Sequence, residues 1–249
     1  MNKLFSLAAF TLLVVTVFGQ NNTDSVFNKT AGSKIKKPAI DLSNRANDHF
    51  LLQAGYTQWA DIPDSITTKG ISKSFNVYFL FDFPFKSNPK LSIALGAGIA
   101  SDHILFSKTY VGIKDNTSAI LFTYQPDTTH FKKTKLATSY LEAPVEFRYS
   151  AEPVTGKGIK FAMGIKVGTL LNAHTRNAKL EDKTNSTINE YVMKEASKKF
   201  FNKTRLSLTG RIGYRHWGIY GSYQLTPLFR DGLGPVVKPF SIGITISGL

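Results

Sequence analysis

The 249-residue chain contains no cysteine. Disulfides, thiolate zinc sites and lipidated cysteines are therefore excluded. Acidic residues are scarce too: 17 Asp and Glu stand against 31 Lys and Arg, which gives a formal net charge of +14. Mean hydropathy is slightly negative although 42% of the residues are hydrophobic. This pairing indicates apolar residues that alternate with polar ones instead of forming long runs.

Catalytic and cofactor motifs are missing as well. No two of the five histidines have the spacing of metal ligands, and HExxH does not occur. Gly96-Ala97-Gly98 begins a nucleotide-binding fingerprint, but strand and not helix follows. A membrane hydrolase would need a serine or threonine beside a histidine, such as Ser101 with His103 or Thr169 with His174, yet the spacing selects neither pair. We predict no enzyme, cofactor, metal site or nucleic-acid partner.

Only one long apolar run is present, and it opens the chain. Met1-Asn2-Lys3 is followed by a largely apolar stretch from Leu4 to Phe18. Its length of about 15 residues is short of the roughly 20 that a spanning helix needs. We predict a signal peptide over residues 1–19, cleaved after Gly19. Residues 20–47 are polar and basic without periodicity, which predicts a flexible periplasmic lead-in.

The rest of the sequence is dominated by alternation with a period of two. In Phe75–Phe83 every odd position is large and apolar, as in a strand with one apolar face. The pattern recurs and predicts eight strands, at residues 48–58, 71–83, 90–104, 137–150, 157–173, 203–214, 217–226 and 238–248.

The connections between these strands alternate strictly between long and short. Short periplasmic turns and long extracellular loops are typical of outer-membrane barrels. We therefore predict that residues 48–249 form an all-β, eight-stranded antiparallel transmembrane β-barrel in the cell outer membrane. A hairpin over residues 111–124 either extends the barrel above the membrane, which we favour, or adds two strands to make ten. Helical spacing between Asn185 and Phe200 predicts a short surface helix.

Charged residues occupy the face opposite the apolar one, and glycines are frequent there. Eight strands leave an interior just wide enough for side chains, so charges inside must be paired. We predict that an ion network plugs the lumen, with Glu146 opposite Lys160 or Glu142 opposite Lys166. Pro144 lacks a ladder donor and predicts a bulge near Glu142. The predicted network comprises Asp82, Glu142, Glu146, Arg148, Lys160, Lys166, Arg205 and Arg211.

The segment Tyr140–Tyr149, YLEAPVEFRY, resembles a strand of the PorT-like outer-membrane β-barrel proteins of Bacteroidetes. Residues 210–225 and 242–246 are similar to the closing strands of that family. The resemblance implies an outer-membrane barrel of the porin kind but no single activity. We expect a non-enzymatic structural or interaction protein, with an accessory role in envelope biogenesis or secretion. The alternative is a narrow porin-like channel. Expected partners are outer-membrane lipid and lipopolysaccharide, through basic loops such as Lys132-Lys133-Lys135, and envelope or secretion proteins.

Overall fold

The computed structural model describes residues 49–64, 66 and 68–248. The predicted signal peptide and lead-in lie outside these residues. Within them, no helix is long and apolar enough to cross a membrane. Eleven strands make up the secondary structure of the described part: β1 (Phe50–Ala60), β2 (Lys73–Pro84), β3 (Leu91–Phe106), β4 (Thr109–Gly112), β5 (Leu121–Tyr124), β6 (His130–Ser150), β7 (Ile159–Glu181), β8 (Thr187–Ala196), β9 (Thr204–Tyr214), β10 (Trp217–Gln224) and β11 (Lys238–Ser247).

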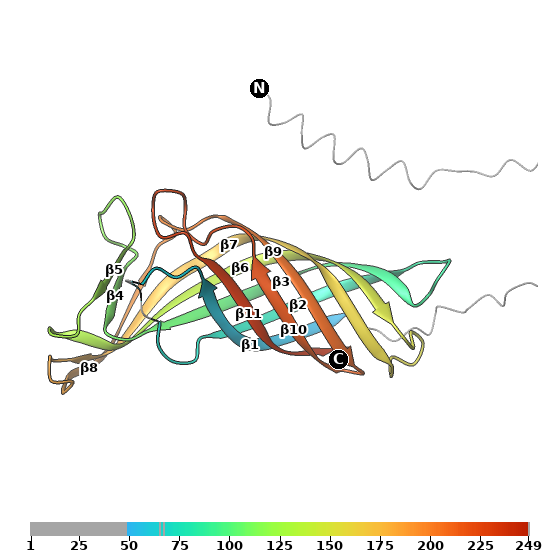
Figure 1. The fold of residues 1–249 in the computed structure, drawn as a ribbon, viewed down its shortest axis with the longest axis horizontal. Helices are drawn as coiled ribbons and strands as arrows, with labels where there is room; N and C mark the ends of the chain where they lie inside the picture. Colours follow the sequence, from blue (N-terminus) through green and yellow to red (C-terminus); the bar gives the residue numbers. More distant parts are fainter. Residues whose placement is uncertain (1–48, 65, 67, 249) are drawn as a thin grey trace, which may run out of the picture. The chain divides into compact units, whose positions relative to one another are not determined.

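Eight of these strands close into a ring (Figure 1). The order around it is β1-β2-β3-β6-β7-β9-β10-β11, with β11 pairing back to β1, and every pairing is antiparallel. The predicted eight-stranded barrel is therefore confirmed, and each ring strand overlaps one predicted strand. The hairpin of β4 and β5 forms a separate two-stranded sheet, so it does not add strands to the ring.

The predicted helix between Asn185 and Phe200 is wrong. Thr187–Ala196 is strand β8, which pairs with the far part of β7. Two physical causes favour the strand. Thr187, Ile188 and Val192 are β-branched, and β7 offers an otherwise unpaired edge of backbone N–H and C=O groups at this height.

The apolar face of each ring strand points outward. On β2, Phe79, Phe81 and Phe83 are 50%, 54% and 55% exposed, whereas Tyr78 and Leu80 between them are buried. A soluble protein would cover such a wall, because large contiguous apolar patches are otherwise sites of association. An outward apolar band around a closed ring of strands is what a bilayer covers.

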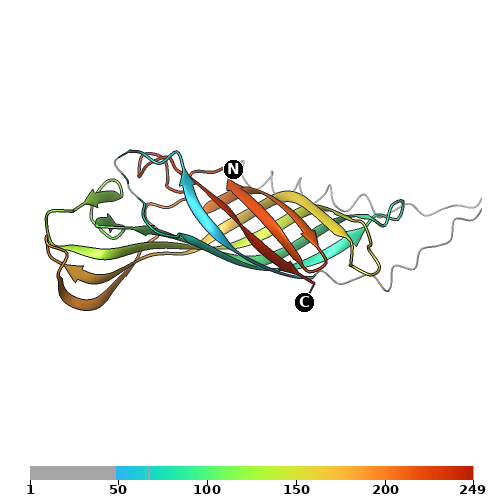
Figure 2. The same ribbon diagram turned by 60° about the horizontal axis from the view of Figure 1, so that its bottom comes forward.

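The two ends of the barrel differ. At the turn end, strands are joined by residues 85–90, 151–158 and 215–216, and β1 begins beside the end of β11. At the long-loop end, residues 61–72, 107–129, 182–203 and 225–237 connect the strands. Figures 1 and 2 show β4, β5 and β8 beyond this second end.

Strands β6 and β7 are 21 and 23 residues long. A membrane-spanning strand needs about 9–11 residues, so roughly half of this hairpin extends past the apolar band. Here β6, β7 and β8 continue together, with the end of β3 paired to β6 as far as Thr134. We call the extended parts of β6, β7 and β8 the protruding sheet.

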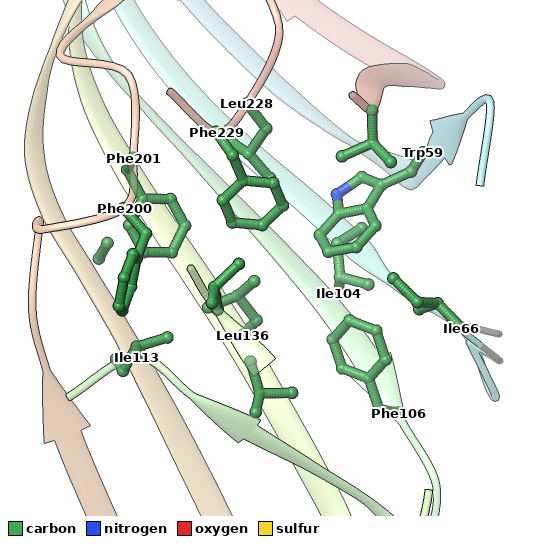
Figure 3. Packing of buried hydrophobic residues seen from close by; sticks show 14 of the residues in the cluster. Trp59, Ile66, Ile104, Phe106, Ile113, Leu136, Phe200, Phe201, Leu228 and Phe229 are labelled. Atoms are coloured by element: carbon green, nitrogen blue, oxygen red, sulfur yellow. The ribbon is translucent and has the colours of Figure 1, made fainter. Parts of the chain in front are cut away.

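Buried apolar side chains close the barrel at the long-loop end. They come from the upper strands and all four long loops and pack on one another (Figure 3). The Phe229 ring lies 5.8 Å from that of Trp59 and 5.2 Å from that of Phe201. We call this group the apolar cap. Its members are Trp59, Ile66, Ile104, Phe106, Val111, Ile113, Ile120, Leu136, Tyr140, Leu170, Ala173, Phe200, Phe201, Leu228, Phe229 and Val237.

We predict that Phe229→Ala loosens the cap without opening the barrel wall. Removing a buried phenyl ring typically costs about 3–5 kcal/mol. Because Phe229 and Phe201 lie in the long loops, trypsin should then cut at Lys198 and Arg230 while the ring of strands stays resistant. The matched control is Tyr124→Ala, since Tyr124 is 56% exposed on β5. Equal protection of the loops in wild type and Phe229→Ala would contradict the assignment of this ring to the cap.

Candidate functional site: the barrel lumen

Below the apolar cap, one row of residues crosses five strands of the lumen wall. Tyr78 on β2 stands opposite Gly98 on β3, which stands opposite Glu142 on β6. Glu142 in turn faces Gly168 on β7, and Gly168 faces Arg205 on β9. Long polar side chains thus alternate with glycines around the barrel.

The two glycines make room for the polar side chains to meet. A Cβ atom on Gly98 would lie 2.4 Å from Cδ1 of Tyr78, and one on Gly168 would lie 2.9 Å from Cγ of Glu142. Both distances are below the contact limit of real Cβ atoms, so even alanine would displace the neighbouring residue. With glycine between them, Glu142 reaches the side chains of both Tyr78 and Arg205.

Glu142 is the centre of the mid-lumen cluster. Its Oε1 lies 3.2 Å from Nε of Arg205, and its Oε2 lies 3.7 Å from Nζ of Lys166. The Tyr78 hydroxyl donates to Oε2 at 2.5 Å. Arg205 also binds Oδ2 of Asp102 through Nη1 at 2.7 Å. Two carboxylates and two cations therefore neutralise one another, which buried ions require.

Aromatic rings flank the cations of this cluster. The guanidinium of Arg205 lies 4.9 Å from the ring centroid of Tyr140, and Nζ of Lys166 lies 5.4 Å from that of Tyr78. Cation–π attraction strengthens when the site is desolvated. Tyr140 also belongs to the apolar cap, so the charged and apolar layers are in direct contact.

A second set of ion pairs, the turn-end cluster, lies nearer the short turns. Oε2 of Glu146 accepts from Nε of Arg148 at 3.0 Å and from Nη2 of Arg211 at 2.8 Å. Nη1 of Arg148 lies 3.7 Å from Oδ1 of Asp82. This cluster also holds two acids and two bases.

The predicted register between β6 and β7 is wrong. Glu146 stands opposite Gly164, and Glu142 stands opposite Gly168. The turn between the strands covers residues 151–158, longer than the predicted connection. Lys166 is consequently opposite Pro144 and reaches Glu142 diagonally.

Lys160 lies at the turn end of the lumen. It pairs in the ladders with Ser150 and Gly213 near the turn end. There it lines a cavity of about 40 Å³ with Asp82, Arg148 and other residues. A cavity of this size accommodates about two or three water molecules.

The bulge predicted near Glu142 is also misplaced. The register of β3 with β6 is the same on both sides of Pro144, although no pairing joins Pro144 and Ala143 to β3. The irregularity lies between β6 and β7, where Ser139 pairs with Asn172 but Tyr140 pairs with Leu170. Leu171 is thus one extra residue on β7.

A family model described as outer membrane protein beta-barrel domain matches residues 39–229. The chain belongs to this family. It is an outer-membrane β-barrel protein, and β11, beyond the matched residues, closes its ring.

The fold also resembles two crystal structures of Ail, the attachment invasion locus protein of Yersinia pestis. One is the complex with the heparin analogue sucrose octasulfate, with 10% identity, a TM-score of 0.39, and coverage of 80% of this chain and 95% of that chain. The other has 10% identity, a TM-score of 0.37, and coverage of 81% and 98%. No curated protein sequence matches the chain.

Residues that a hydrolase or metal enzyme would use do not assemble in the described part of this barrel. Ser101 Oγ lies 3.0 Å from Nε2 of His103 on the outer wall, but in the described residues no further side chain hydrogen-bonds the His103 ring to orient it. His174 contacts Asn172 and not Thr169. Residues 49–248, as far as described, contain no group of three His, Asp or Glu that could hold a metal.

Three residues of the mid-lumen cluster were not predicted from the sequence: Tyr78, Tyr140 and Asp102. The two tyrosines sit at inward positions of strands whose apolar face is outward, and this alternation is the signal that could have found them. Asp102 lies near the end of a predicted strand. Without Asp102 the mid-lumen cluster has one acid, Glu142, for two cations. With Asp102 the charges balance.

We predict that Glu142→Gln destabilises the barrel strongly. The amide keeps the shape but leaves Lys166 without an anion and Arg205 with Asp102 alone, and breaking a buried ion pair typically costs about 3–5 kcal/mol. Urea unfolding in detergent micelles measures the loss. Glu152→Gln, in the exposed turn between β6 and β7, is the matched control and should change stability by less than about 1 kcal/mol. Similar midpoints for the two variants would show that Glu142 is not a centre of stability.

Proposed function

We propose that this protein is a closed, non-conducting barrel that presents its long-loop end, and above all the protruding sheet, to other molecules at the cell surface. The observation that carries the proposal is that two different layers of buried side chains occupy the lumen. Paired charges fill its middle, and the apolar cap seals its long-loop end. We infer that such an interior leaves no continuous aqueous path for solutes.

The length of β6 and β7 supports an interaction role. A barrel built only to span the membrane has no use for strands of about twice the spanning length. Strand β8 adds a third strand with exposed Ile188, Tyr191 and Val192. The role we infer is an accessory one in envelope biogenesis or secretion, as in the PorT-like proteins, with envelope or secretion proteins as partners.

A narrow channel is the second candidate. The cavity of about 40 Å³ beside Asp82, Arg148 and Lys160 leaves room for water at the turn end of the lumen. Conduction would require the mid-lumen cluster and the cap to move aside together. The cavity at one end therefore supports a pore only weakly. The mid-lumen cluster and the apolar cap support a closed barrel more strongly.

We expect no steady conductance when the protein is reconstituted in planar bilayers. Phe229→Ala should also remain closed, because the ion pairs of Glu142 lie below the cap and persist. A large, stable single-channel conductance in the wild type would refute the closed barrel and establish the channel.

The orientation makes a separate prediction. Cysteine placed at Lys183, in the turn between β7 and β8, should react with an impermeant maleimide in whole cells. Cysteine at Ser87, in the turn between β2 and β3, should react only after lysis. Both positions are exposed, and the natural chain has no cysteine to interfere. The reverse pattern would place the long loops in the periplasm.

A further inference from the structure

The outer wall of the barrel changes character just above its apolar band. On β3, β6 and β7 the outward band ends at Ile99, Leu141 and Leu171. The next outward residues are Ser101, Ser139 and Asn172, which the ladders place side by side. Hydroxyl and amide groups thus replace aliphatic ones within one step along the strands.

Three cations lie higher on the same outward face. Lys135 on β6 stands directly opposite Arg176 on β7, which stands directly opposite Lys194 on β8. We call these three residues the outer basic row. His103 and His174 lie between this row and the polar residues below, one on each side of Ala137.

Like charges directly opposite one another in a sheet are destabilising. Burial, followed by the charges of Arg176 and Lys194, lowers the pKa of Lys135, which lies beyond the membrane-spanning part of β6. Among the described residues, no carboxylate pairs with any member of the outer basic row. Glu195 follows Lys194 on β8, but it stands opposite the buried Thr175 and so lies on the other face of the sheet. Glu190, also on β8, is held by Lys179 at 2.6 Å. The row therefore lacks an anion.

Other lysines in this region are already engaged. Lys132 points to the opposite face of β6 and binds Glu181 at 2.8 Å. Lys199 donates to the backbone oxygen of Thr117 and lies over the Phe200 ring. Only some of the basic residues that the sequence offers are thus free to meet a ligand, and the outer basic row gathers three of them from three strands.

The height of the row identifies the anion. Lys135 is six residues beyond Leu141, or about 20 Å along a strand. With the usual tilt of barrel strands this is about 15 Å above the apolar band. Lysine and arginine can bend toward the membrane along their aliphatic stems. The polar headgroup region of a bilayer extends roughly 5–8 Å beyond the hydrocarbon, so the side chains of the row meet headgroup phosphates by bending toward the membrane.

We propose that the outer basic row binds the phosphate groups of an outer-leaflet glycolipid, with Ser101, Ser139 and Asn172 facing the sugar and linkage region below. This inference rests on the orientation given under the proposed function. The ligand is a membrane lipid, because the row continues the lipid-facing wall and does not face the lumen.

The test uses the full mature chain in detergent and native mass spectrometry with bisphosphorylated lipid A as the probe. We expect the triple variant Lys135→Gln, Arg176→Gln, Lys194→Gln to bind it at least about tenfold more weakly than wild type, and the remaining binding to depend less on salt. The matched control removes three exposed lysines at the turn end, with Lys86→Gln, Lys90→Gln and Lys157→Gln. Equal loss in the control, or none in the row variant, would overturn the proposal.

Two further arms separate the sources of binding. Lipid A stripped of both phosphates should bind the wild type as weakly as bisphosphorylated lipid A binds the row variant. Inorganic phosphate at the same concentration should not compete. If the stripped lipid binds equally well, or free phosphate displaces the lipid, the assignment to lipid phosphates fails.

Stability gives an independent readout. Because the row repels itself, the triple variant should unfold in lipid-A-free detergent at the same or a higher urea concentration than wild type. A purely structural role would lower that midpoint. Arg176→Gln alone should also weaken lipid A binding and leave the urea midpoint equal to or higher than that of the wild type. Neither lipid binding nor unfolding depends on conductance, so both can be tested whether or not the barrel is closed. A failure of the proposed orientation would show separately, as a reversed maleimide labelling pattern.

Discussion

The buried carboxylate of Glu142 is the constraint on which the lumen depends. A carboxylate cannot stay ionised inside a narrow barrel unless cations reach it. Lys166 reaches it from β7, and Arg205 reaches it from β9, on the far side of β7. Glycine at positions 98 and 168 removes the side chains that would stand in the way. Large polar residues and glycines therefore alternate in one row across β2, β3, β6, β7 and β9. The requirement for charge neutrality favours this mutual register of the five strands.

Two layers of buried side chains that obey different physics lie in the barrel interior. The ionic layer depends on geometry, because an unpaired buried charge costs far more than a paired one contributes. The cap depends on burial, which is not directional and tolerates the irregular backbone of loops. Tyr140 joins the two, with its ring under the Arg205 guanidinium and within the apolar cluster. The apolar cap therefore lies where loops make the backbone irregular. The ion pairs lie where regular strands hold the side chains in a fixed geometry.

Much of this architecture was predictable from the sequence. The period of two gave the ring strands and their outward faces, because lipid demands one apolar side on every strand. Register was not predictable, since a turn two residues longer shifts every cross-strand partner, as Glu146 and Lys160 show. The apolar cap was invisible for another reason. Its residues, such as Trp59, Phe106 and Phe229, are isolated at the ends of different strands and in a loop, and they become neighbours only when the ring closes.

A single extra residue determines the chemistry of the protruding sheet. Up to Thr169, odd positions of β7 face outward; after the bulge at Leu171, even positions do. His174 and Arg176 therefore lie outside, while Thr175 is buried. Without the bulge, Arg176 would point to the buried side of β7, where Thr175 and Asn177 now lie, and an unpaired charge there is costly. The bulge thus separates a lower part of β7, whose outward side chains suit hydrocarbon, from an upper part whose outward side chains suit anions, and the boundary falls at the end of the apolar band.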